Sequence, residues 1–196
     1  MDATASREPL WDRACHIQAQ MFEETAALGG LDVQLAYYRG FMEFSSTPWT
    51  RNAKDLLGHM TGLRCAAGQT QISRVLEHAN NQARQQSINA LVFVGDCMEE
   101  DPDTLCRLAG ELGILNLPVF VFQDGHDGIA ERTFREVARL SGGAWSRFDL
   151  NSAGQLRDLL CAVAVYAAGG KQALEDFSER RGGVVLKLTH QIDTRT

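Results

Sequence analysis

The 196-residue sequence lacks the residue patterns on which several common classes of protein depend. No two of its five cysteines form a CxxC pair, which argues against a zinc site or a disulfide framework and indicates free thiols in a reducing compartment. The five histidines are equally dispersed, without the paired spacing of a metal site. Acidic residues outnumber basic ones and the formal net charge is −6, so broad nucleic-acid binding is not expected.

Long apolar runs and nucleotide-binding motifs are missing as well. No apolar run approaches the length of a membrane span, and we expect no signal peptide before Asp2. The segment AAGQT (66–70) lacks the lysine of a P-loop, and no G-x-G-x-x-G follows a strand. We therefore expect a cytoplasmic protein that binds neither membranes nor nucleic acid.

What the sequence does contain is typical of one soluble α/β domain over residues 1–196. Hydrophobic residues make up 44% and charged residues 22% of the chain, enough for a sizeable core. Helical periodicity and β-favouring apolar runs alternate along it. The pattern predicts helices over about 7–28, 52–60, 71–83, 101–113, 127–143, 152–170 and 171–180, and strands over 31–40, 88–96, 117–125 and 144–149. The tail 182–192 fits a strand and a short helix equally well.

This alternation predicts an open, mostly parallel sheet with helices on both faces. Ligands of such sheets bind beyond the carboxyl ends of the strands, so polar side chains in those loops are candidate ligands. The candidates are Asp2, Thr4 and Ser6 before the first helix, Thr70 before the helix that starts near Gln71, and Asp96 after the strand that ends at Gly95. All are oxygen donors, which suit a hard cation: Mg²⁺ first, with Mn²⁺ or Ca²⁺ as alternatives.

In this order the five residues resemble the metal-ion-dependent adhesion site of the von Willebrand factor type A (vWA) domain family. That site has Asp-x-Ser-x-Ser, then a threonine, then an aspartate. Here DATAS (2–6) carries Thr4 in place of the first serine, AGQT supplies Thr70, and VFVGDC supplies Asp96, without the usual Thr-Asp-Gly. The resemblance covers nearly the whole chain. Within the family, the chain most resembles a group of small stand-alone bacterial domains. It implies the Rossmann-like vWA fold and a cation bound by Asp2, Thr4, Ser6, Thr70 and Asp96.

The resemblance also implies a central strand that ends at the first aspartate, yet only Met1 precedes Asp2. A parallel sheet without its middle strand leaves two rows of backbone groups without partners inside a core. Three explanations are open: the protein begins further upstream, the tail 182–192 fills the position, or a partner chain does. We expect the first.

The function implied is that of a protein-binding module, not an enzyme, in which the cation captures an acidic residue of a partner protein. Two alternatives stay open: a metal-dependent phosphoryl hydrolase, and a structural domain with a degenerate site. Taken singly, Thr70 could be a helix cap and Asp96 a turn residue.

Three neighbouring features of the sequence lead to further expectations. Glu99 and Glu100 either add favourable charge at a helix N-terminus or fold back onto the cation when no partner is bound. His126 follows a strand and could border the site. Aromatic residues of 37–44 are expected mainly in the core, with part of the segment as a possible partner surface.

Overall fold

The computed structural model describes residues 20–63, 68–148 and 153–192. Residues 20–25 are helical, and the short 3-10 helix η2 (Ala26–Leu28) follows before a left-handed Gly29 ends the element. The rest of the predicted helix over 7–28 lies outside the described residues. Helices and strands then follow in this order: β1 (Ala36–Arg39), β2 (Glu43–Ser46), α2 (Ala53–Thr61), α3 (Ile72–Ala83), β3 (Leu91–Gly95), α4 (Pro102–Ile114), β4 (Val119–Asp124), α5 (Gly128–Ser141), β5 (Trp145–Phe148), α6 (Ala153–Arg181) and α7 (Gly183–Ile192).

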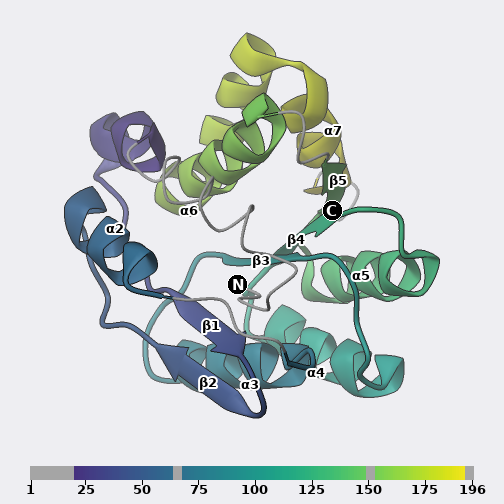
Figure 1. Ribbon diagram of the computed structural model, residues 1–196. Helices are drawn as coiled ribbons and strands as arrows, with labels where there is room; N and C mark the ends of the chain where they lie inside the picture. Colours follow the sequence, from purple (N-terminus) through teal and green to yellow (C-terminus); the bar gives the residue numbers. More distant parts are fainter. Residues whose placement is uncertain (1–19, 64–67, 149–152, 193–196) are drawn as a thin grey trace.

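The strands β3, β4 and β5 form a parallel sheet covered by helices on both faces (Figure 1). Successive side chains of a strand point to opposite faces. On β4, Val119 and Val121 therefore pack with residues of α3, α4 and α5, whereas Phe120 and Phe122 pack with α6 and α7. The three layers confirm the predicted α/β architecture with helices on both faces.

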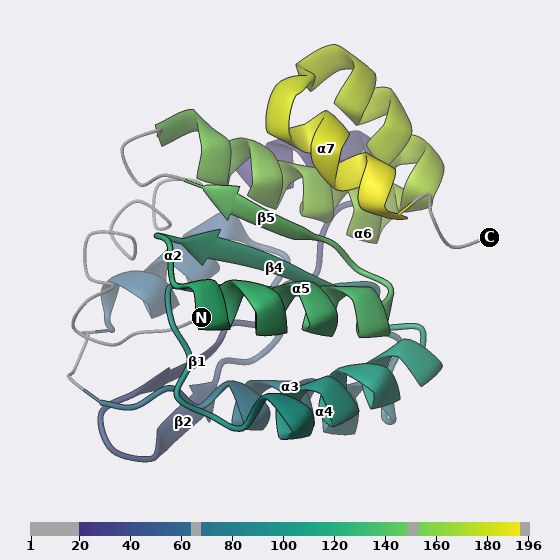
Figure 2. The same cartoon turned by 90° about the vertical axis from the view of Figure 1, so that its right-hand side faces the viewer.

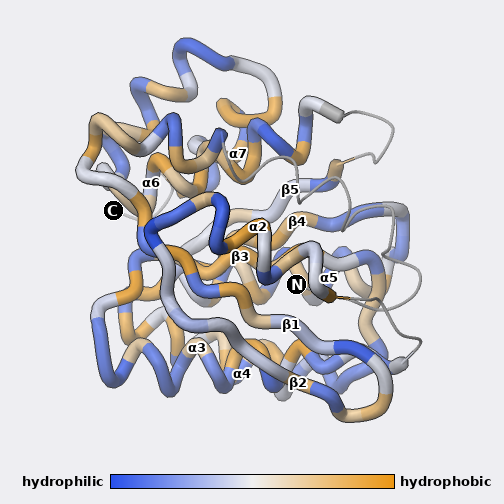
Figure 3. Tube along the Cα trace, turned by 60° about the vertical axis from the view of Figure 1, so that its left-hand side comes forward, coloured by the Kyte–Doolittle hydropathy of each residue, from blue (hydrophilic) through white to orange (hydrophobic). Residues whose placement is uncertain are grey.

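The hydropathy of the chain follows these layers. Figure 3 shows hydrophobic residues along β3 and β4, and alternating hydrophobic and hydrophilic positions along α3 and α4. A strand buried on both faces is apolar throughout, whereas a helix on the surface buries only one side. No helix in the described parts of the chain is both long and apolar enough to cross a membrane.

The C-terminal segment is helical, so a strand over the tail 182–192 is ruled out as the filler of the sheet. Val185 and Leu188 of α7 are buried, and their spacing of three residues fits one face of a helix. Gln191 fixes this helix to β5, because its amide donates to the carbonyl oxygen of Trp145 and accepts from the N–H of the same residue, both at 2.9 Å. The predicted boundary between the two helices before the tail is confirmed: α6 consists of two helical segments that meet at Gly170, whose φ of 72° and ψ of −166° are not helical.

The segment 31–50 differs from the prediction of one strand over 31–40. It forms an antiparallel hairpin of β1 and β2, extended by a bridge between Val33 and Thr50. This hairpin is a sheet of its own, and no strand among the described residues joins it to β3. Among the described residues, a three-stranded parallel sheet thus lies beside a two-stranded hairpin.

Candidate functional site

Thr70 lies in the loop that leads into α3. The loop reaches the β1–β2 hairpin at Gly68, where an added Cβ would come within 1.9 Å of the carbonyl oxygen of Gly40. Only a residue without a side chain allows this approach, so Gly68 sets the path of the loop. Two residues later Thr70 is 8% exposed, at the junction between the hairpin and the helix.

The loop after β3 carries Asp96 and lies against the Thr70 loop. The N–H of Glu99 donates to the hydroxyl oxygen of Thr70 at 3.1 Å, and the N–H of Thr70 donates to the carboxylate of Glu99 at 3.3 Å. Asp96 itself follows Gly95, the last residue of β3, and its Oδ1 accepts from the N–H of Cys97 at 3.0 Å. The structure therefore places the Thr70 and Asp96 loops side by side, as the carboxyl-end argument predicted.

Glu100 binds the N-terminus of α3. Its carboxylate accepts from the N–H groups of Ile72 at 2.6 Å and Ser73 at 2.8 Å, while the N-cap residue Gln71 makes no capping bond with its own side chain. The first N–H groups of a helix have no partner inside it, and a carboxylate there also interacts favourably with the helix dipole. The loop after β3 thus supplies the cap of a helix whose capped residues precede Glu100 by 28 and 27 positions.

Asp101, which follows Glu99 and Glu100, is the N-cap of α4. Its carboxylate accepts from the N–H of Thr104 at 3.0 Å and from its hydroxyl at 2.8 Å. These hydrogen bonds from Thr104 hold the pKa of Asp101 below its ordinary value. The cap of α3 by Glu100 was not predicted.

The tip of the β1–β2 hairpin adjoins the Thr70 loop and carries two exposed apolar side chains. Phe41 is 80% and Met42 64% exposed, whereas Tyr38 is fully buried, so the segment 37–44 is divided between the core and the surface. Arg74 of α3 donates to the carbonyl oxygen of Met42 at 2.8 Å and holds the tip in place. The hairpin was missed because Gly40 was not interpreted as a turn between two short strands.

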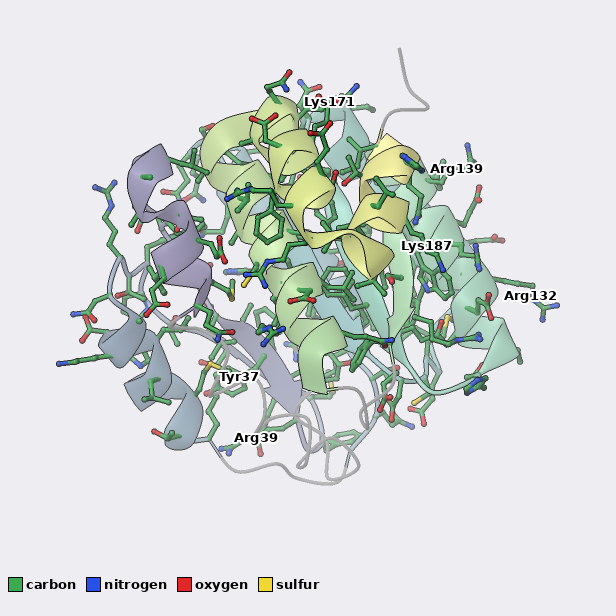
Figure 4. The ribbon with its side chains drawn as sticks, turned by 90° about the horizontal axis from the view of Figure 1, so that it is seen from above. Tyr37, Arg39, Arg132, Arg139, Lys171 and Lys187 are labelled. Atoms are coloured by element: carbon green, nitrogen blue, oxygen red, sulfur yellow. The ribbon has the colours of Figure 1, made fainter. Side chains whose placement is uncertain are left out.

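Met42 also adopts a φ of 57°, which L-residues other than glycine rarely do. A residue whose backbone is strained and whose side chain is exposed to water contributes little to the stability of the fold. At the base of the tip, Arg39 pairs with Glu43 at 2.9 Å. Figure 4 shows Arg39 and Tyr37 on β1, well apart from Arg132 and Arg139 on α5.

The described residues supply only part of the predicted cation site. Thr70 and Asp96 lie on adjacent loops, whereas Asp2, Thr4 and Ser6 lie outside the described residues. Within the described ranges, no three His, Cys, Asp or Glu side chains gather as a metal cluster. Both placed donors are oxygens, and the Thr70 hydroxyl accepts one N–H, which leaves a second lone pair for a cation. The chemistry of these two donors therefore fits a hard cation.

His126 lies after β4, at the edge of the sheet where the parallel strands end. It is exposed, and the neighbouring Asp127 caps α5 by accepting from the N–H groups of Ile129 and Ala130. Figure 2 shows β4 and β5 pointing toward the side where α5 begins. His126 thus shares an edge of the sheet with the candidate site.

Comparison with known proteins identifies the fold. No protein-family model matches the chain, and no curated protein sequence does. A solved structure of a von Willebrand factor type A protein from Catenulispora acidiphila is 17% identical, with a TM-score of 0.62, over 84% of this chain and 41% of that one. This chain therefore spans less than half the length of that protein.

A second solved structure gives the same result over a single domain. The SpRpn10 VWA domain is 14% identical, also with a TM-score of 0.62, over 86% of this chain and 93% of that chain. At these low sequence identities, the two structures show only that the helices and strands are arranged alike. This arrangement agrees with the fold implied by the resemblance of Asp2–Ser6, Thr70 and Asp96, and the chain has the von Willebrand factor type A fold.

Proposed function

We propose that the chain is a cytoplasmic, metal-dependent module that binds an acidic side chain of a partner protein. The cation is Mg²⁺, with Mn²⁺ or Ca²⁺ as alternatives, and its protein ligands are Asp2, Thr4, Ser6, Thr70 and Asp96. The observation that carries this proposal is the pair of hydrogen bonds between Thr70 and Glu99, which holds two of the ligand-bearing loops together. When bound, the cation supplies positive charge that attracts a partner carboxylate.

Of the two glutamates after Asp96, Glu99 is the one suited to occupy the site when no partner is present. The carboxylate of Glu100 is engaged with Ile72 and Ser73 of α3. The carboxylate of Glu99, in contrast, lies 3.3 Å from the N–H of Thr70, beside a proposed ligand. We propose that a partner carboxylate takes the place of Glu99.

The hairpin tip provides the second half of the partner surface. Phe41 and Met42 are exposed next to the Thr70 loop, to which Gly40 joins them through its contact with Gly68. Exposed aromatic and methionine side chains are enriched at protein interfaces. A partner that fits this edge presents an acidic residue flanked by apolar ones.

Cation binding is the direct test and needs no knowledge of the partner. Calorimetric titration with Mg²⁺ and Mn²⁺ should show binding that Thr70→Ala and Asp96→Ala each weaken at least tenfold. Thr70→Ser is the matched control, because it keeps the hydroxyl and should bind the cation as the wild type does. Equal affinity in all four proteins would refute the site.

A catalytic assay distinguishes the enzyme alternative. We propose binding without catalysis, so a generic phosphate monoester should stay intact in the presence of Mg²⁺ or Mn²⁺. Metal-dependent hydrolysis that Asp96→Ala abolishes would contradict this proposal and support a phosphoryl hydrolase.

A further inference from the structure

An apolar cavity of about 210 Å³ lies between the two sheets. Val33 and Leu35, in the segment that leads into β1, line one side, and Val92 and Val94 of β3 line the other. The cavity thus occupies the level of the sheets and separates the hairpin from the parallel strands.

Helices close the cavity on its two remaining faces. Val75 and Ala79 of α3 line it on one face, and Val163 and Ala164 of α6 line it on the other. Figure 1 shows α3 and α6 on opposite sides of β3. Whatever fills the cavity therefore meets apolar side chains both above and below, as a central strand of a three-layer sheet does.

The edge of β3 that faces the cavity offers backbone hydrogen-bonding groups. The N–H of Leu91 donates to the carbonyl oxygen of Pro118 at 3.0 Å, on the side of β4. Because successive residues of a strand direct their N–H and C=O groups to opposite edges, those of Val92 and Val94 point away from β4. The residues that the structure describes provide no strand on that side, although Val94 is only 1% exposed.

The opposite wall offers backbone groups as well. Val33 exchanges two hydrogen bonds with Thr50, at 2.8 and 2.9 Å. Leu35 donates to the hydroxyl of Thr47 and accepts from its N–H. The intervening Gln34 consequently directs its own N–H and C=O toward the cavity, which it also lines. Two strand edges therefore face each other across one apolar space.

Only one kind of molecule satisfies both the walls and the edges. A small apolar molecule would fill the space but leave the backbone groups of Val92, Val94 and Gln34 without hydrogen-bond partners. A helix would also leave them unpaired, because its backbone groups bond within the helix. An extended polypeptide with apolar side chains on both faces meets both requirements.

We propose that this cavity is a binding slot for one extended, apolar segment of a partner polypeptide. The segment adds a strand between the hairpin and β3, hydrogen-bonded to Val92 and Val94 on one side and to Gln34 on the other. It matches the five residues of β3 in length and joins the two sheets into one. The described C-terminal segment is not this strand, because it forms α7.

A synthetic peptide tests the slot. The peptide carries five alternating valine and isoleucine residues, flanked by lysines for solubility, and is added to the chain in excess chelator so that no cation takes part. Amide hydrogen exchange should slow at least tenfold at Val92, Val94 and Gln34. The N–H of Phe93 faces β4 in the parallel ladder and serves as the internal control, since its exchange should change far less.

A second peptide separates backbone pairing from hydrophobic contact. It has the same side chains, but alternate residues are N-methylated, so that it cannot donate along one edge. Its affinity should be at least tenfold lower than that of the parent peptide. Equal affinity, or an equal effect of benzene as a small apolar probe, would overturn the proposal in favour of a non-specific apolar cavity.

Two further outcomes also count against a slot for a partner. Slow exchange of Val92 and Val94 in the chain alone would mean that its own residues already fill the space. If a second copy of the chain fills the slot, sedimentation should show dimers. Hydrogen exchange at the amides of Val92 and Val94 should then slow as protein concentration rises. Because chelator is present throughout, failure of the cation site leaves the result of this experiment unaffected.

Discussion

The carboxylate of Glu100 accepts a hydrogen bond from the backbone N–H of Ser73 at 2.8 Å, so a loop after β3 caps the helix before that strand. Replacing Glu100 with alanine leaves the N–H groups of Ile72 and Ser73 without this acceptor. We expect Glu100→Ala to lower the free energy of unfolding by about 1–2 kcal/mol in urea denaturation. Glu100→Gln should lose less, and Glu179→Ala, at an exposed position of α6, should be close to neutral. Equal loss at positions 100 and 179 would contradict the cap.

Met42 tests whether the backbone of the hairpin tip is strained. Its φ of 57° suits glycine better than methionine, so Met42→Gly should leave the free energy of unfolding unchanged or raise it by up to about 1 kcal/mol. Phe41→Gly, at a residue without a positive φ, should destabilise the fold by roughly 0.5–1 kcal/mol. Urea denaturation compares the two variants. If both destabilise equally, the tip is not strained.

Gly68 tests the contact between the hairpin and the Thr70 loop. In Gly68→Ala the new Cβ would overlap the carbonyl oxygen of Gly40, so the hairpin or the loop has to move. We expect a loss of about 1–3 kcal/mol in thermal or urea unfolding, as for other overpacked sites. Gly110→Ala in α4 is the control: its Cβ meets open space, and alanine there should stabilise by up to about 1 kcal/mol. A loss at Gly110 as large as at Gly68 would refute the steric explanation.

The helices and parallel strands were predictable because their signals are local. The apolar run 91–94 and the capped helix from Asp101 specify their own conformations through periodicity and capping chemistry. The predicted ligands Thr70 and Asp96 could be placed together from one rule about the carboxyl ends of parallel strands. The cation site itself, with Asp2, Thr4, Ser6, Thr70 and Asp96 as its ligands, stays a prediction.

What the sequence did not predict depends on contacts between distant residues. The cap of α3 by Glu100 joins residues 27 and 28 positions apart, and no local pattern indicates such a pair. The conformation of the tail was ambiguous for the same reason, because α7 is fixed by the contact of Gln191 with Trp145. Which part of 37–44 is exposed stayed open because aromatic composition alone does not show which side of a turn faces water.

Glu131 gives the fold a specific dependence on pH. Hydrogen bonds from Arg135, at 3.0 Å from its Nε, and the charge of Arg147 lower the pKa of this carboxyl below 4.5. Because the folded pKa lies below the unfolded one, the ionised group favours the folded chain at neutral pH, and protonation removes this advantage. The stability difference between wild type and Glu131→Gln should therefore shrink as pH falls from neutral to below 4.5. In an Arg135→Met background most of this pH dependence should vanish; if it persists, Arg135 is not its main cause.

Filling the cavity between the sheets tests its energetic cost in the chain alone. Apolar side chains that line a space without packing partners lose van der Waals contacts, so filling the space should stabilise the fold. Ala164→Leu on α6 and Ala79→Leu on α3 each place extra methyl groups into this space, and each should raise the free energy of unfolding by about 1–2 kcal/mol. Ala168→Leu, on α6 but outside the lining, should not. Both leucine variants should also bind the apolar peptide more weakly, because the new side chain and the inserted strand compete for the same space. If stability rises but peptide affinity is unchanged, the peptide binds elsewhere.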